Sequence, residues 1–154
     1  MRIGLTGDTH GNYAALESIA KKNLHVEHWL HTGDFFADAK ILQQLTNIPV
    51  DAVLGNNDFD PNPFDMEKIF KFAGQTIWLI HGHMHGHNLL AKAKEKSADI
   101  VVYGHTHTPA VSWHENILFV NPGSPAYPRS SSKPCFAVLE LFHGILPEVQ
   151  LCKI

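Results

Sequence analysis

The chain has 154 residues, of which 44% are hydrophobic and 18% charged, and this composition is typical of a folded protein rather than a disordered one. The formal net charge of −3 offers no basic surface for a large nucleic-acid partner. No apolar run is long enough to cross a membrane, and the sequence opens directly on a strand-like segment. We therefore expect a single domain over residues 1–154, located in the cytoplasm and without a membrane partner.

The first third of the chain alternates between strand and helix patterns. Short apolar runs predict buried strands at Arg2–Gly7, Val26–Thr32 and Val50–Leu54. Between them, apolar residues at helical spacing predict one helix capped by Asn12 and a second over Ala37–Leu45. A β-α-β-α-β order implies parallel strands joined by right-handed crossovers.

The rest of the chain follows a different pattern, which begins with a proline-containing loop at Asp60–Asp65. One helix is predicted over Asn88–Ser97, and the other elements are strands. The expected strands are, in chain order, Lys68–Phe72, Thr76–Ile80, Asp99–Tyr103, Val111–His114, Ile117–Val120, Cys135–Leu141 and Ile145–Leu151. This half is expected to be mostly antiparallel, and two sheets packed face to face with helices outside would bury both halves in one core.

Metal-binding side chains follow the strand-like runs. They are, in order, Asp8-x-His10, Gly33-Asp34, Gly55-Asn56, His81 and Gly104-His105-x-His107. Loops beyond the carboxyl ends of parallel strands gather at one edge of a sheet, so we expect these side chains to converge. They are too many for one ion and include no Cys, which excludes a thiolate-type structural zinc site. Two ions sharing a carboxylate would suit them, and such a site points to hydrolysis of a phosphate ester.

These five motifs resemble, in content and order, the series D-x-H, G-D, G-N-x-[DE], H, G-H-x-H of the calcineurin-like metallophosphoesterase superfamily. Three segments look like its small single-domain phosphodiesterase branch of bacteria and archaea: Gly55-Asn56-Asn57-Asp58, His81-Gly82-His83 and Asn121-Pro122-Gly123-Ser124. The resemblance implies an α/β fold in the form of a four-layer α/β/β/α sandwich, with two mixed sheets and flanking helices. This agrees with the element order above.

The resemblance also implies a division of the ligands between two divalent ions. One ion would take Asp8, His10, Asp34 and His107, and the other would take Asp34, Asn56, His81 and His105, with Asp34 bridging. Mn²⁺ is expected first, and Fe²⁺, Zn²⁺ or Ni²⁺ also suit oxygen and nitrogen ligands. In this mechanism a water or hydroxide held between the ions attacks phosphorus, which makes Asp34 and Asn56 catalytic as well as ligating.

One position departs from larger relatives. Many superfamily members carry His after the motif Asn, where it can protonate the leaving group, but this chain has Asn57. We therefore expect His83 to be the catalytic acid. Asp58 is expected to hydrogen-bond its own loop, and His31 to be a buried supporting histidine. Arg129 either contacts the substrate phosphate or lies on the surface.

The leading hypothesis is a phosphodiesterase for small or nucleotide-like phosphate esters. Two divalent ions, two aspartates and one hydroxide sum to +1, which a diester monoanion would neutralise. Two alternatives remain open: a phosphomonoesterase acting on a nucleotide or a phosphoprotein, and a non-catalytic scaffold similar to the eukaryotic retromer subunit. The expected partner is a small phosphate-ester substrate, and a homo-oligomer is compatible with the sequence.

Overall fold

The computed structural model describes residues 1–22, 24–59 and 66–154. The strands are β1 (Arg2–Thr6), β2 (His28–His31), β3 (Val50–Ala52), β4 (Glu67–Phe72), β5 (Gln75–Ile80), β6 (Ile100–Val102), β7 (Ala110–His114), β8 (Ile117–Asn121), β9 (Cys135–Phe142) and β10 (Ile145–Lys153). The helices are α1 (Tyr13–Lys21), α2 (Ala37–Thr46), the short 3-10 helix η2 (Gly86–Asn88) and α3 (Leu89–Glu95). Each described strand and α-helix lies close to its predicted range, whereas η2 was not predicted. The predicted loop at 60–65 falls outside the described residues.

The strands form two mixed five-stranded sheets. The first has the order β10-β9-β1-β2-β3, and the second has the order β4-β5-β6-β8-β7. β1, β2 and β3 are parallel, as the β-α-β-α-β pattern predicted. β9 pairs antiparallel with β1, so the last hairpin of the chain extends the sheet that the first strand began.

The prediction of a mostly antiparallel second half was wrong for the middle of the second sheet. β5, β6 and β8 are parallel neighbours, and only the edge strands β4 and β7 run antiparallel to them. The reason is the connection through α3: a strand that returns to its sheet by way of a helix lies parallel to the strand it left. After β6 the chain forms β7 at the outer edge of the sheet and returns as β8 between β6 and β7. β8 is antiparallel to β7 and therefore parallel to β6.

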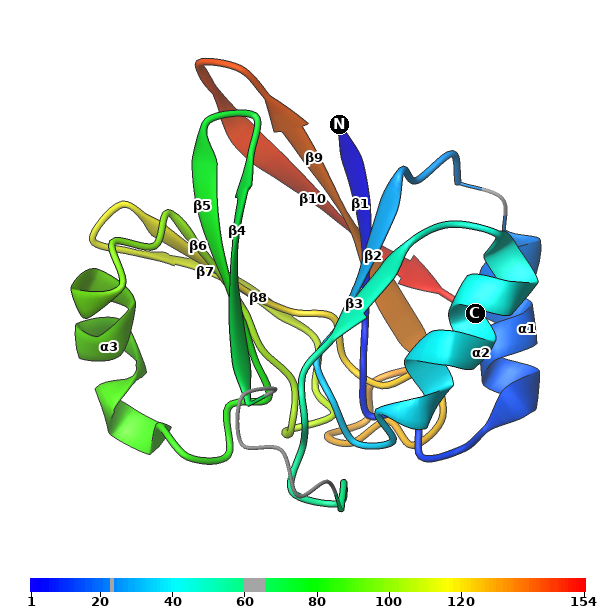
Figure 1. Ribbon diagram of the computed structural model, residues 1–154. Helices are drawn as coiled ribbons and strands as arrows, with labels where there is room; N and C mark the ends of the chain where they lie inside the picture. Colours follow the sequence, from blue (N-terminus) through cyan, green and yellow to red (C-terminus); the bar gives the residue numbers. More distant parts are fainter. Residues whose placement is uncertain (23, 60–65) are drawn as a thin grey trace.

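Four layers result, with α1 and α2 outside the first sheet and α3 outside the second (Figure 1). The side chains alternate along each strand, and the central strands, such as β1, β6 and β8, are buried on both faces. In β5, for example, Leu79 points into the core between the sheets, whereas Trp78 packs under α3. In β2, Leu30 joins the central core and Trp29 packs under α1 and α2.

Helix capping agrees with the sequence. The Asn12 side chain accepts a hydrogen bond from the Ala15 amide and begins α1. α2 ends at Thr46, and the left-handed conformation of the next residue, Asn47, closes the last turn. Across the described part of the chain, the helices are all too short or too polar to cross a bilayer.

Leu79→Ala should lower the free energy of unfolding by about 2–5 kcal/mol, because Leu79 is completely buried between the two sheets. The matched control is Ile69→Ala on the neighbouring strand β4, where the side chain is 49% exposed and the expected loss is below about 1 kcal/mol. Urea unfolding of both variants measures the difference. Equal losses would show that the two sheets do not share the core described here.

Candidate metal centre

Four of the predicted ligands meet in one cluster. Asp8 and His10 follow β1, Asp34 follows β2, and His107 follows β6. Each offers one ligand atom, and these atoms all lie within 4.8 Å of one another. The loops that follow β1, β2 and β6 and carry these residues gather at the edge of the sheets opposite the N-terminus (Figure 1). Loops from both sheets therefore contribute to a single site, which is the convergence predicted from the strand ends.

His107 presents a free lone pair to this cluster. Its Nδ1 lies 2.7 Å from the Tyr127 carbonyl oxygen, which can only accept, so Nδ1 carries the proton. Its Nε2 then lies 3.3 Å from Nε2 of His10 and 3.5 Å from Oδ1 of Asp8. That Asp8 oxygen is buried and has no hydrogen-bond partner among the described residues. The His107 lone pair and the orphaned Asp8 oxygen therefore face each other, and a cation between them would remove their repulsion.

His81 repeats the same arrangement on the other side of Asp34. Its Nδ1 donates to the Thr32 carbonyl at 2.8 Å, which leaves Nε2 as an acceptor. Nε2 faces two oxygens, Oδ1 of Asn56 at 3.0 Å and Oδ1 of Asp34 at 3.4 Å. Asn56, His81 and Asp34 are thus brought together as predicted, and this second donor set also fits a divalent cation.

His105 and His83 lie beside this second set. The His105 ring is 5.2 Å from the His81 ring, and its backbone amide donates to Oδ2 of Asp8 at 3.0 Å. The His83 ring is 5.3 Å from the His81 ring and 6.1 Å from the His105 ring. Burial and the neighbouring His105 lower the pKa of His83. His83 is therefore at the site, and its role as the acid stays a prediction.

The two carboxylates at the centre differ in their protonation. Burial and the nearby charge of Asp34 raise the pKa of Asp8 to about 7 in the metal-free protein. Burial also opposes ionisation of Asp34, but two hydrogen bonds from Asn57 and the charges of His81 and His10 outweigh it and hold the pKa of Asp34 below its ordinary value. The Asn57 amide and side chain donate to Asp34 at 3.0 and 2.6 Å. The sequence shows that Asn57 cannot act as an acid, but no sequence signal predicted its two hydrogen bonds to Asp34.

Asp58 ties two candidate ligand loops together, although only the contact within its own loop was expected. Its Oδ1 accepts from the amides of Phe35 and Phe36 at 2.8 and 2.6 Å, and its Oδ2 accepts from the Gly55 amide at 2.8 Å. The loop after β2 is thereby fixed to the loop after β3. Both carboxylate oxygens of Asp58 are therefore used in hydrogen bonds that fix the loops.

Asn121 and Ser124 hold the loops that carry the candidate ligands. The Asn121 amide donates to the Gly104 carbonyl at 2.9 Å, just before His105. The Ser124 hydroxyl donates to the Asp8 carbonyl at 2.8 Å. The loop after β8 therefore braces the loops that carry ligands of both sets.

His31 is a buried supporting histidine, as predicted. It accepts from the Gly33 amide through Nδ1 at 3.1 Å, so its Nε2 carries the proton and donates to the Thr9 hydroxyl at 3.0 Å. Complete burial lowers the pKa of His31 to about 4, which keeps the ring neutral. The neutral His31 ring therefore connects Thr9, which lies between two candidate ligands, to Gly33, which precedes Asp34.

Five of the seven predicted ligands have a left-handed backbone: Asp8, His10, Asp34, His105 and His107, with φ between 48° and 69°. Residues other than Gly occupy this region infrequently, and such strain concentrates at functional sites. No sequence motif predicted this backbone conformation. The strained turns allow each loop to direct its side chain back toward the cluster as soon as its strand has ended.

Metal binding should release a proton from Asp8 at low pH. Because the pKa of Asp8 is raised to about 7, the group is mostly protonated at pH 6 and mostly ionised at pH 8, and a metal ligand must be ionised. His81, whose pKa is lowered to about 4, has no proton to release in this range. Mn²⁺ affinity should therefore rise about tenfold per pH unit up to pH 7 from this one group.

Calorimetry in buffers of different ionisation enthalpy measures the released protons. Metal binding to the Asp8→Asn variant should release about one proton fewer than metal binding to the natural chain at pH 6. At pH 8 the two proteins should release the same number of protons. Equal proton release at pH 6 would contradict the raised pKa of Asp8.

Comparison with known proteins finds relatives named as metallophosphoesterases and phosphodiesterases. The "Probable metallophosphoesterase MJ0623" of Methanocaldococcus jannaschii is 34% identical over 142 residues, which cover 86% of this chain and 72% of that protein. The "Phosphodiesterase YfcE" of Escherichia coli K12 is 29% identical over 117 residues, covering 68% and 61%.

Solved structures with this fold include proteins of different kinds. A Vps29 single mutant from Entamoeba histolytica superposes with a TM-score of 0.80 at 22% identity, covering 100% of this chain and 99% of that one. A novel archaeal phosphodiesterase superposes with a TM-score of 0.78 at 23% identity, covering 99% and 100%. At these identities the match shows the fold alone. The profile of the calcineurin-like phosphoesterase superfamily domain matches residues 1–144, and the chain belongs to that superfamily.

Proposed function

We propose that the protein is a metal-dependent phosphodiesterase that hydrolyses small or nucleotide-like phosphate esters at a centre of two divalent cations. The observation that carries this proposal is the position of Asp34 between the two donor sets. Its Oδ2 lies 3.6 Å from Nε2 of His10, and its Oδ1 lies 3.4 Å from Nε2 of His81. One carboxylate that faces a set of lone pairs on each side is the arrangement expected of a bridging ligand.

Each donor set would hold one ion. Asp8, His10, Asp34 and His107 would hold the first, and Asp34, Asn56, His81 and His105 the second. Oxygen and nitrogen donors suit Mn²⁺, with Fe²⁺, Zn²⁺ or Ni²⁺ as alternatives. When bound, such ions lower the pKa of water and neutralise charge on the phosphoryl group. The chain itself orients Asp34 through Asn57 and keeps Asp8 out of water.

Pockets on both sides of the centre favour a diester. One pocket, of about 650 Å³, includes His81 and His83 in its wall. A second, of about 390 Å³, is lined by His10, His107, Tyr127 and Arg129. A phosphodiester carries two organic arms and a monoester only one, so two pockets match the diester better. The name of YfcE supports the same choice, and so does the charge balance at a two-ion centre.

A non-catalytic scaffold is the competing function. The similarity to Vps29 is at 22% identity, so it shows the fold alone and does not favour a shared role. The buried Asp8 and Asp34, with two histidines whose lone pairs face them, support hydrolysis instead, because such a centre is costly to keep without a cation.

Mn²⁺ added to the metal-free protein should produce hydrolysis of bis(p-nitrophenyl) phosphate that exceeds hydrolysis of p-nitrophenyl phosphate. Asp34→Asn should reduce the rate by more than about a hundredfold, because it removes a charge that both ions share. Asp99→Asn, an exposed carboxylate, is the matched control and should keep the rate. Faster monoester hydrolysis would favour the phosphomonoesterase, and no metal-dependent hydrolysis of either ester would contradict catalysis.

Arg129→Ala should raise KM for the diester about tenfold with little change in kcat, since the guanidinium borders the smaller pocket and would contact a negatively charged substrate. Lys133→Ala removes the same charge from an exposed position of the same loop and should leave KM unchanged. Steady-state kinetics at saturating Mn²⁺ distinguish the two variants. Equal effects would mean that Arg129 acts only through the overall charge of the loop.

A further inference from the structure

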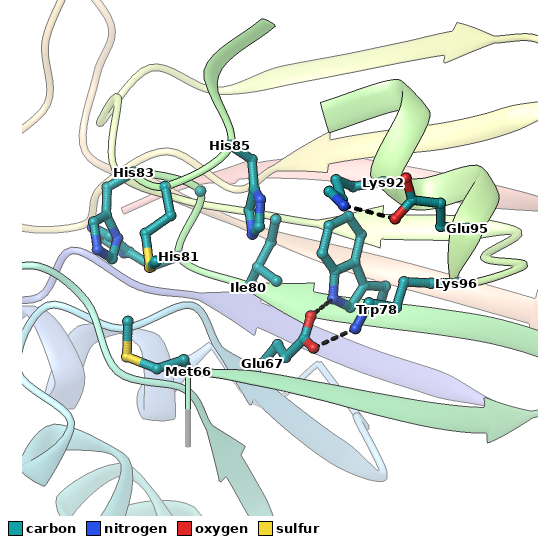
Figure 2. A pocket seen from close by; sticks show the side chains of 12 residues that line it. Met66, Glu67, Trp78, Ile80, His81, His83, His85, Lys92, Glu95 and Lys96 are labelled. Atoms are coloured by element: carbon teal, nitrogen blue, oxygen red, sulfur yellow. Dashed lines mark hydrogen bonds and ion pairs between the residues drawn. The ribbon is translucent and has the colours of Figure 1, made fainter. Parts of the chain in front are cut away.

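The larger pocket extends from the metal centre along the outer face of the second sheet. This side pocket lies between β4, the end of β5 and α3, and residues in its wall include Met66, Trp78, His83, Met84, His85 and Lys96. His81 and His83 stand at one end, and Glu67 and Lys96 at the other (Figure 2). Because His81 belongs to the second donor set, a molecule whose phosphorus lies at the centre can reach into the side pocket.

Aromatic and thioether groups line the middle of the side pocket. The rings of Trp78 and His85 are 5.2 Å apart and tilted by 58°. Trp78 is completely buried beneath the pocket, so the partly exposed His85 is the ring that a ligand can contact. Met66 and Met84 contribute their thioethers, and Met84 is 67% exposed. Methionine sulfur and aromatic faces both interact favourably with flat rings. This part of the wall suits a flat ring system better than a sugar or a second phosphate.

The far end of the side pocket is polar, but its charges are paired. Glu67 accepts from the Trp78 indole N–H at 2.7 Å and forms an ion pair with Lys96 (Figure 2). Lys92 and Glu95 form a second pair at 2.7 Å. Paired charges offer hydrogen-bonding groups without a net attraction for an anion. The far end therefore favours a neutral ring edge with donors and acceptors.

We propose that the side pocket receives the base of a nucleotide-type ester whose phosphorus lies at the metal centre. This inference rests on the proposed function, because it uses the same centre to hold the phosphate. The volume of about 650 Å³ accommodates a nucleoside and lies in the usual range for small-molecule sites. A base is flat, apolar on its faces and polar at its edge, which matches the order of groups along the wall.

The methionines provide a test in the natural chain, because the sequence has only three of them: Met1, Met66 and Met84. The protein is labelled with ¹³C-methyl methionine, loaded with the diamagnetic ion Zn²⁺ and titrated with adenosine 5′-monophosphate. The methyl signals of Met66 and Met84 should shift through the ring current of the base, whereas Met1, which packs against the central core, should not. Ribose 5-phosphate, which lacks the base, should shift neither pocket methionine.

A pair of variants gives a second readout. Met84→Ala should weaken binding of adenosine 5′-monophosphate roughly threefold in calorimetry, because it removes apolar contact with the base. Leu146→Ala, at a similarly exposed site of β10 (72% exposed, against 67%), should leave binding unchanged.

Three outcomes would overturn the inference. They are binding of adenosine 5′-monophosphate without shifts at Met66 and Met84, identical shifts with ribose 5-phosphate, and no binding of the nucleotide. Turnover of bis(p-nitrophenyl) phosphate is measured separately. Hydrolysis without the shifts would reject the side pocket and leave the phosphodiesterase standing, and shifts without hydrolysis would leave a nucleotide site and reject the enzyme.

Discussion

The close approach of two buried carboxylates, Asp8 and Asp34, is the constraint on which the rest of the site depends. Two such groups cannot both ionise cheaply away from water, so Asp8 keeps its proton up to about pH 7 and Asp34 must be stabilised. Asn57 stabilises Asp34 with two hydrogen bonds, and the lone pairs of His81 and His107 increase the negative potential. The surrounding scaffold holds these groups together against their repulsion. The negative potential that they create attracts a divalent cation.

The scaffold meets this constraint by placing the ligand loops after strands that are buried on both faces. β1 lies in the centre of its sheet, between β2 and β9, so the loop that carries Asp8 begins at a fixed point. The loops are then connected to one another rather than to solvent. Asp58 connects the loops after β2 and β3, Ser124 reaches Asp8 from the other sheet, and His31 connects Thr9 to Gly33. Movement of one loop would therefore break hydrogen bonds in the next.

Much of this could be predicted from the sequence, because the informative signals were local. Apolar runs gave the strands, Asn12 gave the start of α1, and the position of each ligand after a run predicted the cluster of Asp8, His10, Asp34 and His107. The pairing of β9 with β1 was beyond this reasoning, since it joins segments more than 130 residues apart and leaves no mark on the pattern of either strand. The parallel order of β5, β6 and β8 was missed for a similar reason: short strands look alike in either direction. The contacts of Asn57 and His31 depend on side-chain geometry that only the folded chain defines.

The left-handed backbone at the ligands also limits how this centre can drift over evolutionary time. Asp, Asn, His and Gly tolerate that conformation far better than branched residues such as Val, Ile or Thr. A first replacement at Asp8 or Asp34 that preserves the shape of its loop is therefore Asn or Gly. Related proteins that lose metal binding but keep the fold should therefore carry Asn or Gly at these positions first. Their loops would keep the backbone conformation of the metal site after the ligands have been replaced.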